Sequence, residues 1–100
     1  MIIYNVTIKI NPEILDEWLR WMKEEHIPDV LGTGMFYEHK MSRLLEQDES
    51  EGITFIIQYL CVSMESYKIY REKFAPKLQE EVRRKFGGKF VAFRTLMEEV

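Results

Sequence analysis

Residues 35–62, MFYEHKMSRLLEQDESEGITFIIQYLCV, decide the fold of this chain. The two ends of this stretch, 35–45 and 53–62, are rich in β-branched and aromatic residues, which predicts two strands. The segment 46–52 between them is acidic and ends in glycine, which predicts a solvent-exposed hairpin loop. A hairpin in the middle of the chain makes these two strands antiparallel neighbours.

Upstream of the hairpin, the sequence predicts a strand followed by a helix. Residues 2–10 are β-branched and aromatic, with an apolar residue at every second position, which indicates the first strand. Asn11-Pro12-Glu13 is typical of a helix start, with Asn as the capping residue and Pro at the first helical position. We expect this helix to end near Glu25, because Pro28 and then Gly32-Thr33-Gly34 indicate a crossover loop.

Downstream of the hairpin, the sequence predicts a second helix and a last strand. Ser63 can cap the helix, whose apolar residues keep helical spacing as far as Gly87-Gly88. Pro76 lies inside this helix, so we expect a kink near Phe74-Ala75. Residues 89–98 form the fourth predicted strand.

The order strand, helix, strand, strand, helix, strand fills residues 1–100, which predicts a single domain of the α+β class with a ferredoxin-like βαββαβ sandwich. The rules for crossover connections predict a four-stranded antiparallel sheet of order 4-1-3-2 with both helices on one face. Proteins of this topology have unrelated functions, so the fold alone does not predict one.

The composition excludes several functions. A net charge of −3 argues against a nucleic-acid partner, and no apolar run reaches the roughly 18 residues of a membrane span. The predicted strand 53–62 lacks the glycines and the basic residue of an RNA-recognition motif. Cys61 is the single cysteine, so a thiolate pair for a soft metal cannot form, and we expect neither a metal nor a cofactor. Residues 1–10 do not resemble a leader peptide, and a cytoplasmic location is expected.

The chain resembles a known group of proteins at two places. Residues 18–36 contain the pattern W-x-x-W-M-K-x-x-H-I-P-x-V-L-x-T-G-M-F, and residues 90–95 read FVAFRT. Both resemble an uncharacterised family of short, stand-alone bacterial proteins in the dimeric α/β-barrel group. In that group two ferredoxin-like subunits press their sheets together. The resemblance implies a homodimer, and it supplies no catalytic residues because the group is related to monooxygenases, isomerases and stress proteins by fold alone.

Candidate ligand-binding residues gather near the end of the first helix. His26 continues the apolar stripe of that helix and should point at the sheet, where it would serve as a general base or bind a ligand. The alternative is that its ring caps the helix end by bonding a loop carbonyl. Tyr37 and His39 share one strand face and would converge with His26, or else His39 is simply a histidine on an edge strand. Trp18 either lines an apolar pocket or packs in the core.

The other face of the sheet mixes apolar and polar side chains. We expect it to form a dimer interface, because such a face is too apolar for water and too polar for a sealed core. A polar ligand cavity in the barrel is the less economical alternative. The interface is predicted to contain Ile3, Asn5, Thr7, Ile56, Gln58 and Arg94.

Two functions remain open from the sequence. The first is a non-catalytic homodimer that serves as a binding or regulatory module. The second is a cofactor-free enzyme of the monooxygenase or isomerase type, acting on an apolar or aromatic substrate among Tyr4, Trp18, Tyr37, Tyr59 and Phe93. A cavity above about 300 Å³ that bears both histidines would favour a ligand site, whereas a core filled by the aromatic rings would favour the first function.

Overall fold

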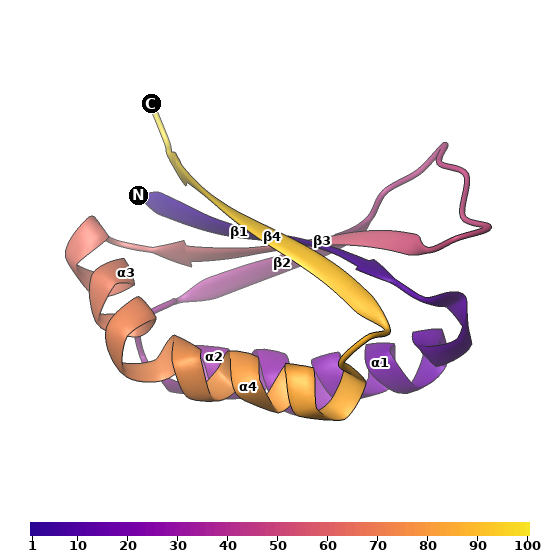
Figure 1. Ribbon diagram of the computed structural model, residues 1–100. Helices are drawn as coiled ribbons and strands as arrows, with labels where there is room; N and C mark the ends of the chain where they lie inside the picture. The colour runs from indigo at the N-terminus through magenta and orange to yellow at the C-terminus, as the bar shows by residue number, and fades with distance from the viewer.

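The computed structural model describes all 100 residues. Its elements are β1 (Ile2–Ile10), α1 (Leu15–Trp21), α2 (Ile27–Gly32), β2 (Glu38–Arg43), β3 (Ile53–Cys61), α3 (Met64–Ile69), α4 (Ala75–Phe86) and β4 (Phe90–Glu98). They form a ferredoxin-like sandwich, in which all the helices lie on one side of the sheet and the other side is uncovered (Figure 1). None of these helices is long and apolar enough to cross a membrane.

The sheet has the predicted topology. Its order is β2-β3-β1-β4, and every neighbouring pair is antiparallel, which confirms the order 4-1-3-2 read from the other edge. β3 and β1 lie in the centre of the sheet, and β2 and β4 form its edges. β2 is shorter than the predicted strand 35–45, since Phe36 leaves the ladder and is buried against the aromatic rings of the core.

The first helix is longer than predicted. It does not end near Glu25 but continues to Gly32, because a π turn, Met22–His26, joins α1 to α2. In this turn the backbone N–H of Ile27 donates to the carbonyl of Met22, five residues earlier. The widened turn comes just before Pro28, whose missing N–H would otherwise leave a gap in the α-helical ladder.

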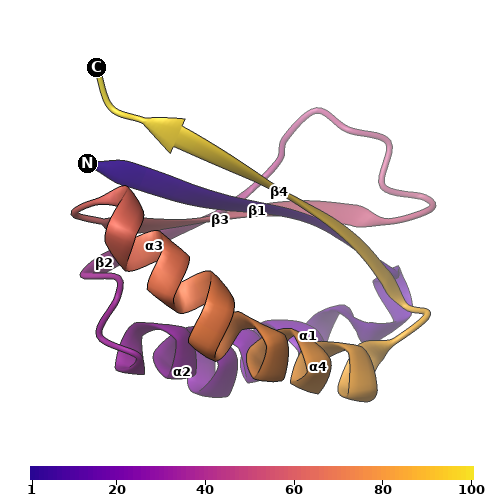
Figure 2. The same ribbon diagram turned by 60° about the vertical axis from the view of Figure 1, so that its left-hand side comes forward.

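The second helix has the same construction. A π turn, Tyr70–Phe74, joins α3 to α4 and comes just before Pro76, so the expected irregularity lies at the predicted place. Figure 2 shows that α3 is inclined to α4 where this turn lies. Ser63 caps α3 as predicted, with its hydroxyl accepting a hydrogen bond from the backbone N–H of Ser66 at 3.2 Å.

The register assigns each strand residue to one face of the sheet. Ile2, Tyr4, Val6, Ile8 and Ile10 of β1 face the helices and pair with the helix-facing residues of β3 and β4. The main core lies between this face and the helices and includes Trp18, Tyr59 and Phe86. A small cavity remains in this core, between the helices and the strands β3, β1 and β4.

Candidate functional site

A cavity lies between the sheet and the two helices. Its volume is about 50 Å³, and ten of its thirteen lining residues are apolar or aromatic. The lining consists of Tyr4, Val6, Ile8, Met22, His26, Val30, Ile57, Tyr59, Tyr70, Gln79, Val82, Phe90 and Arg94. A cavity needs about 10–15 Å³ of this volume to hold one water, so there is room here for three to five groups of that size. It is therefore smaller than the roughly 300 Å³ expected of a ligand site, and it is lined by His26 but not by His39.

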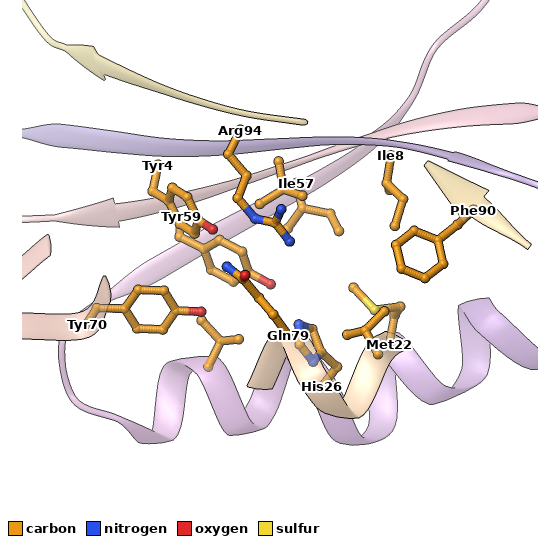
Figure 3. A pocket seen from close by; sticks show the side chains of 13 residues that line it. Tyr4, Ile8, Met22, His26, Ile57, Tyr59, Tyr70, Gln79, Phe90 and Arg94 are labelled. Carbon is orange, nitrogen blue, oxygen red and sulfur yellow. The ribbon is translucent and has the colours of Figure 1, made fainter. Parts of the chain in front are cut away.

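Arg94 belongs to the cavity and not to the outer face of the sheet. It pairs with Val6 in the β1–β4 ladder, and the even-numbered residues of β4 face the helices. Arg94 therefore does not lie on the outer face of the sheet, where we predicted it. Figure 3 shows its side chain reaching from β4 toward Gln79 and His26. Because β4 is an edge strand, Arg94 remains exposed, and it occupies the open side of the cavity.

Arg94 is the only charged residue that lines the cavity. None of the four ion pairs of the protein includes it, since these join exposed groups elsewhere on the surface. Its guanidinium lies close enough to Tyr4 and Tyr70 to oppose the rise in pKa that burial causes at both phenols. The cavity therefore contains one positive charge and no carboxylate to balance it.

His26 is the last residue of the first π turn, Met22–His26, and lies at the floor of the cavity. Its ring stacks on Trp21 with the centroids 5.2 Å apart, and its Nδ1 atom is buried without a hydrogen-bond partner. Burial lowers the pKa of His26 to about 4, Asp29 opposes this shift and Arg94 adds to it. The imidazole is therefore neutral near pH 7 and presents an unpaired polar atom.

Three phenol rings form the wall of the cavity nearest α3. The ring of Tyr4 lies 6.0 Å from that of Tyr59 and 5.7 Å from that of Tyr70, measured between centroids. Burial raises the pKa of both Tyr59 and Tyr70, because it disfavours the charged phenolate and no hydrogen bond to either hydroxyl offsets this. These hydroxyls stay protonated at neutral pH and can donate hydrogen bonds to a molecule in the cavity.

The other predicted ligand residues lie outside the cavity. Trp18 is fully buried in the core, where its ring packs 5.1 Å from that of Phe55. Tyr37 and His39 are exposed near the β2 edge, so the expected convergence with His26 does not occur. Gln79 of α4 also lines the cavity, and the helical pattern does not distinguish it from the other polar residues of that helix.

The outer face of the sheet carries more apolar surface than the sequence indicated. Phe93, which we expected among the aromatic residues of a pocket, points outward and is 62% exposed. Val91 and Met97 of β4 share that face and are also exposed. The predicted interface residues Ile3, Asn5, Thr7, Ile56 and Gln58 lie on the same face, where Asn5 donates a hydrogen bond to Thr7 at 3.1 Å.

The whole chain matches the model of one protein family. The family described as a domain of unknown function, DUF4286, matches residues 1–100. The chain belongs to this family. Among functionally curated proteins no sequence matches this DUF4286 chain.

Solved structures with the same fold are similar to the DUF4286 chain over its whole length. An EthD (ethyl tert-butyl ether) family protein from Bacillus halodurans has 14% identity and a TM-score of 0.69, with 100% of both chains covered. A structure described as an antibiotic biosynthesis monooxygenase has 14% identity and a TM-score of 0.68, with 100% and 99% covered. A dimeric ferredoxin-like protein from an uncultured marine organism has 18% identity and a TM-score of 0.67, with 100% and 95% covered. Identities this low support the fold, and the fold alone does not fix the function.

Proposed function

We propose that this protein is a homodimer that binds a small molecule in the cavity between its sheet and its helices. The observation that carries this proposal is one buried polar atom without a partner, beside an exposed guanidinium without an ion pair, at an otherwise apolar cavity. The Nδ1 atom of His26 has no partner, and Arg94 has no ion pair. Buried polar groups usually have a hydrogen-bond partner, and a bound molecule would supply one.

The protonation states favour binding over catalysis. A general base works best when its pKa lies near the working pH, and the pKa of His26 is about 4. The phenols of Tyr59 and Tyr70 have raised pKa values and hold their protons. The groups in the cavity are thus suited to holding a ligand more than to moving a proton at neutral pH.

The second candidate is a cofactor-free monooxygenase or isomerase. It is favoured by the similarity to a structure described as an antibiotic biosynthesis monooxygenase and by the unpaired Nδ1 of His26. In such an enzyme His26 would remove a proton from carbon while Arg94 stabilises the resulting oxyanion. NMR in heavy water can monitor whether a bound compound exchanges a carbon-bound hydrogen for deuterium. Such exchange would distinguish this function from simple binding.

The ligand proposal is tested by filling the cavity. Saturation-transfer NMR with a library of small compounds should detect binders to the unmodified protein. The variant Val82→Phe places a larger side chain in the cavity and should abolish their signals. The control variant Val62→Phe makes the same change at an exposed position and should retain them. Methyl shifts of Ile57 on titration give a second measurement if Val82→Phe fails to fold. A library without binders, or binders that move no Ile57 resonance, would contradict the proposal.

The homodimer rests on the uncovered face of the sheet. That face has Ile56 in its centre and Phe93 on its β4 side, and a structural neighbour of similar length is described as dimeric. Pairing two such faces would bury the exposed rings, and a stable pair of this kind buries about 1,600 Å² in total.

Cys61 is buried and has no cysteine partner, which suits the reducing cytoplasm in which we place the protein.

Replacing Ile56 by glutamate should convert the dimer to a monomer. The change brings a charge onto the apolar part of each face, so that two like charges meet across the two-fold axis. Sedimentation velocity at micromolar concentration should show a dimer for the unmodified protein and a monomer for Ile56→Glu. The control Lys77→Gln makes the same change in net charge on the exposed side of α4 and should remain dimeric. A monomeric unmodified protein would contradict the proposed interface.

A further inference from the structure

We infer that the ligand of this cavity is a small carboxylate, whose negative group enters the cavity and forms an ion pair with Arg94. This inference rests on the proposed function and adds the chemical class of the ligand. It follows from three independent features of the cavity, which are its charge, its donors and its size.

The charge of the cavity is positive and unbalanced. Arg94 is its only charged side chain, and no aspartate or glutamate lines it. The nearby acidic residue Asp29 lies outside the lining, although it is close enough to affect the pKa of His26. Two of the other five arginines, Arg43 and Arg83, pair with glutamates. A ligand with one negative charge would balance Arg94, and a guanidinium binds a carboxylate through two parallel hydrogen bonds.

The remaining polar groups suit an acceptor. The hydroxyls of Tyr59 and Tyr70 are protonated donors, and Gln79, which also lines the cavity, carries an amide N–H. The neutral ring of His26 can place its proton on the buried Nδ1 atom, which has no other partner. A carboxylate accepts up to four hydrogen bonds, so one group can satisfy donors on the sheet and on both helices at once.

The size of the cavity selects the shape of the anion. A volume of about 50 Å³ admits three to five groups of water size, and a carboxylate has three non-hydrogen atoms. The walls are aromatic and aliphatic, which suits a flat group. Arg94 lies on the exposed β4 edge, so the rest of the ligand can leave the cavity on that side.

The test compares carboxylates with neutral compounds of the same shape. Butyrate and benzoate should bind, as followed by NMR shifts of the Ile57 methyl groups, whereas butyramide and benzamide should bind at least tenfold more weakly. Arg94→Gln should weaken benzoate binding by at least tenfold, and Tyr70→Phe should weaken it severalfold. The control Arg84→Gln removes an exposed arginine that does not line the cavity and should leave binding unchanged. Arg94 is exposed on an edge strand, so its replacement should leave the fold intact, which circular dichroism can check.

The possible outcomes separate this inference from the proposed function. Equal binding of benzoate and benzamide, or full binding to Arg94→Gln, overturns the carboxylate inference and leaves the cavity as a ligand site. Tighter binding of inorganic phosphate than of either carboxylate also overturns it and assigns a tetrahedral anion instead. If the library and the carboxylates all fail to shift the Ile57 methyl groups, both the inference and the proposed function are wrong.

Discussion

Replacing Trp18 by alanine is expected to lower the free energy of unfolding by about 3–5 kcal/mol. Trp18 is fully buried and packs against Phe55, so the change removes a large ring and leaves a cavity at the seam between α1 and β3. Chemical denaturation followed by circular dichroism measures the loss. A decrease below about 1 kcal/mol would contradict this placement of the ring.

The matched control is Trp18→Phe. The indole Nε1 of Trp18 is buried without a hydrogen-bond partner, and a phenyl ring removes this unpaired donor while filling most of the space. We therefore expect a loss of about 1 kcal/mol, well below that of the alanine variant. Trp18→Phe should also leave ligand binding intact, because Trp18 does not line the cavity.

The stability of the protein should fall by about 3 kcal/mol between pH 7 and pH 4 because of His26 alone. Burial holds the pKa of His26 near 4 in the folded protein, against about 6.5 in the unfolded chain. Between these values the unfolded chain binds the extra proton, so acid favours unfolding. This contribution to stability is fully present above about pH 6.5 and is lost as the pH falls to 4.

Two measurements isolate the contribution of His26. The side chain of the variant His26→Gln cannot titrate, whereas the carboxyl groups titrate in both proteins and cancel in the comparison. The difference in unfolding free energy between the variant and the unmodified protein should therefore shrink as the pH falls. A proton NMR titration of the imidazole should independently give a midpoint near 4. A midpoint above 6 would show that the ring is not desolvated as the structure indicates.

The fold could be predicted from local patterns. The alternation in residues 2–10 and 53–62, the acidic hairpin between the middle strands and the Ser63 cap are each short-range signals, and the sheet order follows from them through the crossover rules. The length of the first helix could not be predicted in this way. Pro28 reads as a helix breaker, and only the backbone shows that a π turn lets the helix pass it.

The candidate site was harder to predict than the fold. The helical spacing of residues 15–26 was enough to place His26 toward the sheet, and His26 lines the cavity there. Arg94 could not be placed, because the strand 90–98 has apolar residues on both faces and its alternation does not say which face is inward. The ladder with β1 decides the matter, and pairing across a sheet depends on residues distant in the sequence.

The π turn Met22–His26 also affects how this chain is aligned with its relatives. A π turn holds one residue more than the α-helical turn that it replaces. In a relative that lacks the turn, an alignment without a gap inside the helix displaces every later position of that helix by one residue. The counterpart of His26 would then be sought on a different side of the helix, and the turn Tyr70–Phe74 has the same effect on α4. At identities of 14–18%, superposed backbones are needed to decide whether a one-residue gap belongs in each turn.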